Sequence, residues 1–354
     1  LDRLLLDEGR VFGMATGLHE VAQLPDPVGR VLEERERPNG LILRKISTPI
    51  GVIVIIYESR PNVTADAAGL CFKSGNTTIL RGGKEAHNSN RMIAQLMIEA
   101  GCNTSGDFPE HSIQVVPTPD RAAISELLAQ TESVDLCIPR GGEGLIRAVA
   151  KCSRVPVIKH YKGICSVYIN GSADLEMALK ITENSKTHRP GVCNAMETLL
   201  IDEAIAPSLL PLMADTMRKH NVELRGDEKA QSILGDRCKA AVAEDWNTEY
   251  LDLICAVRLV NGLDEAIDHI NEHGSGHTDT IVTDDAPSAA RFQNEIDSST
   301  VFWNASTRFT DGGQFGMGAE IGISTDKIGA RGPMGLAELT SYKWLGTGDG
   351  LIRE

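Results

Sequence analysis

Several features that define large classes of protein are absent from this sequence. No apolar run approaches the length of a membrane-spanning helix, about 18 residues, and no signal-peptide pattern opens the chain. The 8 cysteines include no C-x-x-C pair, and several lie in apolar runs, which is typical of reduced, buried thiols. Positive charge is scarce, with 35 Lys and Arg against 49 Asp and Glu, which excludes a broad surface for nucleic acid. We therefore expect a cytoplasmic protein that binds neither a membrane nor nucleic acid.

The sequence does contain a repeated alternation of short apolar strands and helical stretches. With 354 residues, the chain can form two ordinary domains. Strands are expected at 52–56, 77–80, 113–116 and 134–138, and a second alternation runs from 173 to 303. Uninterrupted apolar strands between helices indicate parallel sheets covered on both faces. The predicted fold class is therefore α/β, with two three-layer domains that join near residue 165.

Residues 29–49 interrupt this alternation. Two charged, strand-like segments flank Pro38-Asn-Gly40, which is a good hairpin turn. The run 339–345 has the same character of an edge strand. We expect these segments to form a small β arm outside the core, and an exposed arm of this kind pairs with a further partner that the pattern does not identify. The predicted limits are 1–28 and 50–165 for the first domain, 166–335 for the second, and 29–49 with 336–354 for the arm.

One thiol is a candidate nucleophile. Cys193 lies in a predicted loop between a helix and a strand, in the segment Lys186-Thr-His-Arg-Pro-Gly-Val-Cys-Asn-Ala-Met-Glu197. The cations Lys186, His188 and Arg189 could lower the pKa of this thiol, and the thiolate is the reactive form. From these residues alone, a structural loop cysteine is the more common alternative.

Two glycine-rich turns are candidates for binding a phosphate group. The segment Pro139-Arg-Gly-Gly-Glu143 follows a strand and opens a helix, where backbone NH groups favour an anion. The segment Leu80-Arg-Gly-Gly-Lys-Glu85 follows another strand and puts Arg81 and Lys84 where NAD-binding proteins commonly carry an acidic residue. These cations suit a 2′-phosphate. Each segment also has a plainer interpretation. A glycine-rich entry to a helix is often only a turn, and Glu85 beside Lys84 fits a charged turn exposed to solvent.

Two further patterns do not support a site of their own. His269, His273 and His277 recur at four-residue spacing, but two glycines end that helix before the third imidazole. The segment Gly316-Met-Gly-Ala-Glu-Ile-Gly322 has one residue too many for a dinucleotide fingerprint, and no strand directly precedes it. We predict no metal site, and we interpret the glycine segment as backbone that lines a substrate.

Ordered segments from about residue 1 to the end resemble the γ-glutamyl phosphate reductases, a branch of the aldehyde dehydrogenase superfamily. The matching segments are Pro49-Ile-Gly-Val-Ile53, Tyr57-Glu-Ser-Arg-Pro-Asn-Val63, Leu80-Arg-Gly-Gly-Lys-Glu85, Ile138-Pro-Arg-Gly-Gly142, Pro190-Gly-Val-Cys-Asn-Ala-Met-Glu-Thr198, His277-Thr-Asp279, Phe302-Trp-Asn-Ala-Ser-Thr-Arg308, Gly316-Met-Gly-Ala-Glu-Ile-Gly-Ile-Ser324 and Ala330-Arg-Gly-Pro-Met-Gly335. Chance does not supply so many matches in order.

This resemblance implies an aldehyde dehydrogenase fold with a cofactor domain, a catalytic domain and an oligomerisation arm, in a homodimer or homotetramer. The implied activity is NADPH-dependent reduction of L-glutamyl 5-phosphate to L-glutamate 5-semialdehyde, a step of proline biosynthesis, through a thioester on Cys193. The cofactor, NADPH or NADP+, is expected to contact the two glycine-rich turns and a glutamate for the nicotinamide ribose: Arg81, Gly82, Gly83, Lys84, Arg140, Gly141, Gly142 and Glu249.

Further residues are predicted to contact the small-molecule substrate. Arg60 and Arg308 are candidates because a guanidinium group binds carboxylate and phosphate, and Asn194 lies next to the nucleophile. Asn62 is expected to stabilise the oxyanion together with the backbone NH of Cys193. Alternatively, Arg308 only forms an ion pair with the nearby Asp311.

The resemblance also favours one type of reaction. Oxidising aldehyde dehydrogenases carry a glutamate general base that activates the water that cleaves the thioester. In the corresponding stretch, 157–163, this chain has His160 near the place of that glutamate. Water attack is then poorly assisted, which favours acyl-phosphate chemistry.

Two departures from the family pattern leave alternatives open. The chain opens with Leu1 in the middle of an amphipathic pattern, so we expect a helical segment upstream of it to be missing. Ser166 stands where the family usually has histidine, and we assign it no role. The alternatives are a phosphorylating or hydrolysing dehydrogenase for another aldehyde, and a scaffold that retains only nucleotide binding or oligomerisation.

Overall fold

The chain forms two compact units in a computed structural model that describes residues 4–58 and 60–353. Unit 1 runs to Lys159 and resumes at Phe315, and unit 2 is His160–Gln314. The structure thus groups residues 315–335 with unit 1, whereas the sequence pattern indicated the second domain. This stretch has little helix or strand periodicity, and its place depends on contacts distant in sequence. Residues 1–3, 59 and 354, which the predicted limits include, lie outside the described residues.

Unit 1 has a parallel four-stranded sheet between two layers of helices. Its strands lie in the order β5-β4-β3-β6. Apolar side chains on alternate residues of β3 point to opposite faces, so Ile53 and Ile55 pack with α1–α3, and Val54 and Ile56 pack with α4 and α5. The elements are α1 (Glu8–Gln23), β3 (Val52–Tyr57), α2 (Asn62–Lys73), β4 (Thr77–Arg81), α3 (His87–Thr104), β5 (Ile113–Val115), α4 (Ala122–Leu127), β6 (Leu136–Arg140), α5 (Glu143–Cys152), β14 (Gly322–Ser324) and β15 (Gly332–Met334).

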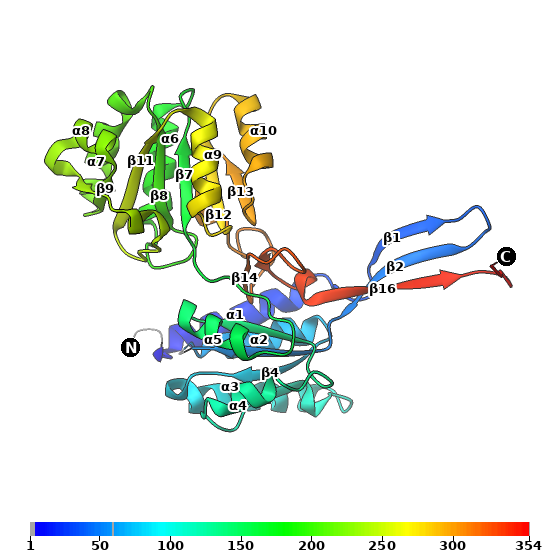
Figure 1. Cartoon of the computed structure of the whole chain (residues 1–354). Helices are drawn as coiled ribbons and strands as arrows, with labels where there is room; N and C mark the ends of the chain where they lie inside the picture. Colours follow the sequence, from blue (N-terminus) through cyan, green and yellow to red (C-terminus); the bar gives the residue numbers. More distant parts are fainter. Residues whose placement is uncertain (1–3, 59, 354) are drawn as a thin grey trace. The chain divides into compact units, whose positions relative to one another are not determined.

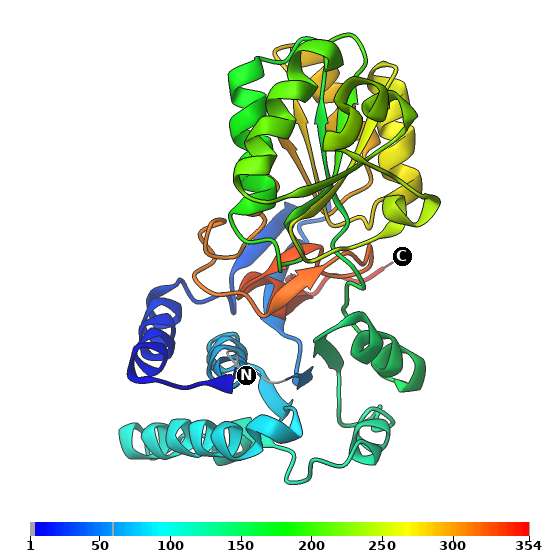
Figure 2. The ribbon, with the colours of Figure 1, turned by 90° about the vertical axis from the view of Figure 1, so that its left-hand side faces the viewer.

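Unit 2 has a parallel seven-stranded sheet in the order β10-β9-β11-β8-β7-β12-β13. Helices α6–α8 pack on one face, and α9 and α10 pack on the other (Figure 2). The elements are β7 (Cys165–Ile169), α6 (Leu175–Thr187), β8 (Met196–Asp202), α7 (Ala206–Lys219), β9 (Glu223–Gly226), α8 (Glu228–Leu234), β10 (Lys239–Ala240), β11 (Ile254–Val260), α9 (Gly262–His273), β12 (Thr278–Val282), α10 (Ala286–Glu295) and β13 (Thr300–Trp303). The predicted α/β class with two three-layer domains is confirmed.

The predicted arm is an antiparallel three-stranded sheet. Strands β1 (Val31–Glu36) and β2 (Ile42–Pro49) form the hairpin, and β16 (Thr340–Thr347) pairs with β2 (Figure 1). Gly40, with φ of 84°, allows the turn, because a left-handed backbone suits glycine best. Among the described residues, no helix is long and apolar enough to cross a bilayer.

Candidate active site

The predicted nucleophile lies at the amino edge of the sheet of unit 2. Cys193 is half-buried in the loop between α6 and β8. Because β8, β7 and β12 are parallel neighbours, the residues that begin or precede these strands lie side by side. Gly163, Cys165 and His277, all distant from residue 193 in sequence, therefore surround this loop.

The backbone of Cys193 packs directly on the chain that enters β7. A Cβ atom at Gly163 would lie 1.9 Å from the carbonyl oxygen of Cys193, so no larger residue fits there. The Cys165 thiol donates to the same oxygen over 3.2 Å. Burial raises the pKa of Cys165 well above its usual value. Cys165 is thus a neutral packing group, which leaves Cys193 as the candidate nucleophile.

The other side of the loop is anchored by Asn194. Its side-chain NH₂ donates to the backbone carbonyl oxygen of Thr310 over 2.8 Å, and the backbone carbonyl oxygen of Asn194 accepts from the Thr307 hydroxyl over 2.7 Å. Asn194 is 4% exposed, and its Oδ1 is buried without a hydrogen bond. These contacts give Asn194 a role in positioning Cys193. The predicted contact with substrate stays a prediction.

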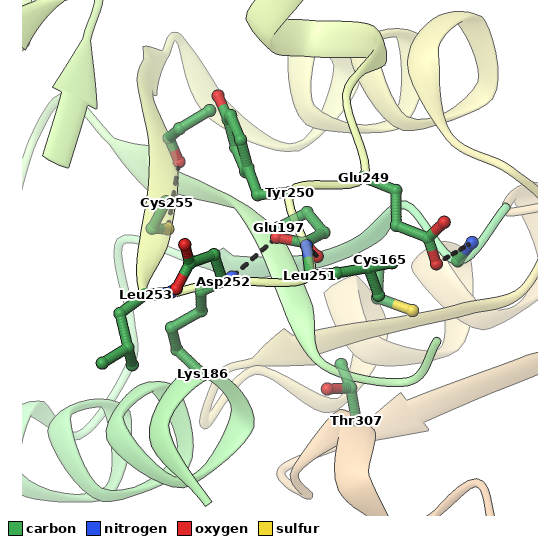
Figure 3. Close-up of polar contacts among 12 residues, drawn as sticks. Cys165, Lys186, Glu197, Glu249, Tyr250, Leu251, Asp252, Leu253, Cys255 and Thr307 are labelled. Carbon is green, nitrogen blue, oxygen red and sulfur yellow. Dashed lines mark hydrogen bonds and ion pairs between the residues drawn. The ribbon is translucent and has the colours of Figure 1, made fainter. Parts of the chain in front are cut away.

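A buried ion pair lies beneath this loop. The ammonium of Lys186 is 2.6 Å from Glu197, both side chains are fully buried, and Glu197 also accepts from the backbone NH of Leu251 over 3.1 Å (Figure 3). Burial raises the pKa of Glu197 to about 7 although Lys186 opposes the shift. Lys186, which we expected beside the thiol, is therefore engaged with Glu197.

Two histidines lie next to Cys193. One ring nitrogen of His160, one of His277 and the Cys193 sulfur all lie within 4.8 Å of one another. Burial, and then the neighbouring His160, lower the pKa of His277 to about 3, so this imidazole is neutral. The sequence pattern did not bring these residues together, because its spacing placed His277 with His269 and His273 instead. Only the order of the strands brings His277 to Cys193.

Arg308 lines a hollow of about 300 Å³ in unit 2. The Nε of Arg308 donates to Nδ1 of His188 over 3.3 Å. Asp311 lines the same hollow, and its Oδ1 accepts from the backbone NH of Gly313. Burial lowers the pKa of Arg308, and Asp311 opposes that shift. The other lining residues are Asn184, Phe309 and Gln314. The hollow offers one cation and one anion to a small ligand.

Glu249 approaches the chain that packs on Cys193. Its carboxylate accepts from the backbone NH of Gly163 over 2.9 Å (Figure 3). Glu249 thus lies in unit 2 near the loop of the nucleophile. Its predicted contact with the nicotinamide ribose stays a prediction.

The first glycine-rich turn lies at the carboxyl end of β4 in unit 1. Arg81 is 9% exposed, and its guanidinium donates to the carbonyl oxygens of Pro119 at 2.7 Å and Gly82 at 3.1 Å. Its Nε is buried without a hydrogen bond. Lys84 is exposed directly after Gly83. The buried Arg81 and the exposed Lys84 together form a basic corner at this strand end.

The second glycine-rich turn lies between β6 and α5. Strands β4 and β6 flank β3 on opposite sides, so the carboxyl ends of β3 and β6 form the point where the strand order reverses, a common place for ligands. Here the backbone NH of Gly142 donates to Glu58 over 3.2 Å. The NH group expected to bind a phosphate thus contacts a carboxylate. Arg140 and Gly141 lie in the same turn.

Asn62 and Arg60 lie at the start of α2, also at this edge of the sheet. The side-chain NH₂ of Asn62 donates to Asp66 over 3.1 Å. Burial raises the pKa of Asp66, although Asn62 and Arg140 oppose the shift. Both predicted residues belong to unit 1, whereas Cys193 belongs to unit 2. Their roles toward the nucleophile stay predictions.

Comparison with known proteins places the chain in a family. The model of the aldehyde dehydrogenase family matches residues 10–235. A γ-glutamyl phosphate reductase of Geobacter metallireducens is 54% identical over all of this chain and 84% of the relative. The crystal structure of γ-glutamyl phosphate reductase from Thermotoga maritima has 47% identity and a TM-score of 0.97, covering 100% of this chain and 84% of that one.

A more distant structure shows the fold alone. An acetylating aldehyde dehydrogenase from Geobacillus thermoglucosidasius has a TM-score of 0.70 at 20% identity, covering 96% of this chain and 83% of the other. From these matches and the thiol loop between α6 and β8, the chain belongs to the aldehyde dehydrogenase family, within its branch of γ-glutamyl phosphate reductases.

Proposed function

We propose that this chain reduces L-glutamyl 5-phosphate to L-glutamate 5-semialdehyde and phosphate with NADPH, a step of proline biosynthesis, and that Cys193 is the nucleophile. The observation that carries this proposal is the half-buried thiol held at the amino edge of the sheet by Gly163. Relatives that share 54% identity bear the name of this activity. The coarser activity, an oxidoreductase that acts on an aldehyde, follows from the family.

The first step is attack by the Cys193 thiolate on the γ-carbonyl carbon of the acyl phosphate. The C–S bond forms, the bond from carbon to the phosphate oxygen breaks, and inorganic phosphate leaves. A thioester then remains on Cys193. The backbone NH of Cys193 and, as predicted from the sequence, the NH₂ of Asn62 would stabilise the oxyanion of this step.

The neighbours of Cys193 support the persistence of that thioester. Hydrolysis would need a base that takes a proton from water, and an imidazole whose pKa is about 3 is a weak proton acceptor. Glu249, the predicted cofactor residue, accepts from the backbone NH of Gly163. The thioester therefore lasts until it is reduced, or until phosphate attacks it in the reverse direction.

The basic corner at the end of β4 fits NADPH. A ribose 2′-phosphate needs positive charge, which Arg81 and Lys84 provide, and the carbonyl contacts of Arg81 hold its guanidinium in place. Bound NADPH would supply a hydride to the thioester carbon, and the resulting hemithioacetal on Cys193 would then break its C–S bond, which releases the semialdehyde and restores the thiolate. Gly82 and Gly83 would let the cofactor approach the backbone, and the turn at Arg140–Gly142 and Glu249 would hold its pyrophosphate and nicotinamide ribose.

The hollow around Arg308 fits the amino-acid end of the substrate. L-Glutamyl phosphate carries an α-carboxylate and an α-ammonium, and the hollow presents Arg308 and Asp311. Asn194 positions the nucleophile beside this region, through its contact with Thr310. Arg60 is retained as a candidate for the phosphate group.

The test is the reverse reaction, NADP+ reduction with glutamate 5-semialdehyde and phosphate. We expect the wild type to require phosphate and to prefer NADP+ to NAD+, and Cys193→Ala to lose activity by at least about 1000-fold. Equal rates for wild type and Cys193→Ala would overturn the proposal. Turnover by the wild type without phosphate would instead indicate a hydrolysing dehydrogenase, and NADP+ binding without turnover would indicate a scaffold.

A further inference from the structure

We propose that Cys193, His160 and His277 form a binding site for a thiophilic divalent cation, represented by Zn²⁺, and that an ion bound there reversibly blocks the nucleophile. The sequence led us to expect no metal, so this site is a departure from that expectation. Binding of the ion goes beyond the proposed reaction and does not depend on it, because it needs only the three side chains, whereas the block of the nucleophile rests on that proposed function.

The donor set selects the kind of ion. One thiolate and two imidazoles are soft or borderline ligands, which suit zinc and not magnesium or calcium. A zinc ion with three protein ligands keeps a fourth position for water. Among the described residues, this is the one group of three potential ligands whose donor atoms all lie within 4.8 Å of one another.

The spacing of the rings agrees with tetrahedral coordination. Two imidazoles on one zinc ion, each at about 2.0 Å from nitrogen to metal, have ring centres on the order of 5 Å apart. The ring centres of His160 and His277 are 5.5 Å apart, and the planes are inclined by 72°. A contraction of well under 1 Å, on the order of 0.5 Å, therefore suffices.

His277 has a ring nitrogen ready for a metal. Its Nδ1 lies 2.9 Å from the Thr278 hydroxyl, and that hydroxyl donates its own proton to Thr310 over 2.9 Å. Nδ1 of His277 must therefore donate to Thr278, which leaves the lone pair on Nε2. Nε2 is buried without a hydrogen bond. A metal ion would satisfy this buried, unpartnered lone pair, on a ring that has a nitrogen within 4.8 Å of the Cys193 sulfur.

Zinc binding and acylation compete, because the ion coordinates the sulfur atom that must attack the acyl carbon and withdraws electron density from it. The ion replaces the proton of the Cys193 thiol, so one proton is released to solvent for each ion bound. Affinity should therefore rise with pH until the thiol is deprotonated. Removing the ion with a chelator should restore the free thiol without a redox step.

The primary experiment measures alkylation of Cys193 by iodoacetamide in the wild-type chain, with each cysteine followed by peptide mass spectrometry. Zn²⁺ is expected to slow alkylation of Cys193 at least about tenfold, and EDTA should reverse this. Cys102, which is exposed in unit 1, is the internal control and should react at the same rate with and without Zn²⁺. Equal protection of both thiols, or of neither, would overturn the proposal.

The second experiment measures zinc affinity by competition with a chromophoric chelator. His160→Asn and His277→Asn should each weaken binding roughly tenfold or more, and Cys193→Ala should abolish it. His220→Asn is the matched control, because His220 is half exposed and pairs with Glu183 instead. Unchanged affinity in all three site variants would contradict the proposal.

The two experiments also separate the zinc site from the proposed function. Alkylation needs neither substrate nor turnover, and it uses the unmodified chain, so a misfolded His277→Asn variant leaves that test intact. Zinc protection without reductase activity would support the site and count against the reaction. Reductase activity without zinc protection of Cys193 would support the proposed reaction and count against the zinc site.

Discussion

Arg308 is the charged residue whose position most directly suggests how a substrate is held. Its guanidinium shares a hollow with Asp311, and His188 fixes its Nε at 3.3 Å. A fixed guanidinium can present two parallel NH groups to a carboxylate, which a lysine ammonium cannot. Arg308 can therefore offer a substrate carboxylate both a positive charge and a fixed pair of NH donors.

We expect Arg308→Lys to raise KM for glutamate 5-semialdehyde about tenfold or more and to change kcat much less, because a charge-assisted contact made equally in ground and transition states is lost. Steady-state kinetics with saturating phosphate and NADP+ measure this. Arg291→Lys is the control, since Arg291 pairs with Asp264 on α9 and with Glu295 on α10. An unchanged KM would show that Arg308 does not bind the substrate.

His269 makes the stability of unit 2 sensitive to acid. It is 4% exposed on α9, and its Nδ1 accepts from the Arg258 guanidinium over 2.9 Å. Burial, and then Arg258 and His273, lower its pKa from 6.5 to about 3. Between these two pH values the unfolded chain binds a proton that the folded chain does not, so acidification destabilises the fold.

His269→Gln should therefore reduce the dependence of the unfolding free energy on pH. This histidine contributes about 1.4 kcal/mol per pH unit below pH 6.5, and the variant lacks that contribution. Urea unfolding of both proteins at several pH values below 6.5 gives the two slopes. His111→Gln, at an exposed position of unit 1, should keep the wild-type slope. Parallel slopes for His269→Gln and wild type would refute this explanation.

At the scale of elements, the loop between α6 and β8 is shaped by the chain that enters β7. Gly163 has no side chain, and a Cβ there would lie 1.9 Å from the carbonyl oxygen and 2.6 Å from the Cα of Cys193. Backbone atoms cannot give way as a flexible side chain can. The position of the sulfur atom thus depends on a residue in another segment.

Gly163→Ala is expected to lower kcat roughly 100-fold, because displacing a nucleophile by about 1 Å costs that much. Gly191→Ala is the control in the same loop, since its Cβ would lie 3.7 Å from the nearest atom, an ordinary contact. Both variants are compared by steady-state kinetics and by thermal unfolding. Wild-type activity in Gly163→Ala would mean that this close packing does not position the nucleophile.

The sequence predicted continuous apolar elements better than polar or irregular ones. The strands expected at 52–56 and 77–80 are β3 and β4, each of which extends one residue further. Strand β9 was not predicted, because Glu223-Leu-Arg-Gly226 alternates charged and apolar residues near the sheet edge and lacks β-branched side chains. Strand β7 was taken for the domain boundary although it is fully buried.

The candidate site was predictable in part for a related reason. The composition of the loop made Cys193 a candidate, the family resemblance made it the predicted nucleophile, and the turn after β4 indicated a basic corner. His160, Gly163 and His277 were not assigned to the site, because their meeting depends on the order β8-β7-β12. Lys186 was misplaced because its partner Glu197 becomes adjacent only when α6 packs against β8.

At the scale of the whole molecule, the arm presents apolar side chains to solvent in the isolated chain. Tyr342, Trp344 and Leu345 of β16 and Val31 and Leu32 of β1 are all exposed. A strand edge with exposed apolar side chains is a surface on which another chain can pair. This supports the predicted homodimer or homotetramer, which stays a proposal.

Replacing Trp344 and Leu345 together with lysine should convert the assembly to monomers, because charge on the arm opposes pairing with a second arm. Sedimentation velocity measures the change. Ile328→Lys is the control, since Ile328 is 93% exposed in unit 1 outside the arm. A wild type that sediments as a monomer, or a double variant that keeps the wild-type mass, would contradict the role of the arm.

Our main proposal for this chain is that Cys193 carries the acyl group. It is tested most directly by mixing the enzyme with glutamate 5-semialdehyde and NADP+ in the absence of phosphate, then stopping the reaction in acid. We expect a burst of one NADPH per chain and a glutamyl group on the peptide that contains Cys193. Continuous NADPH production without phosphate, or an unmodified Cys193 after the burst, would contradict it.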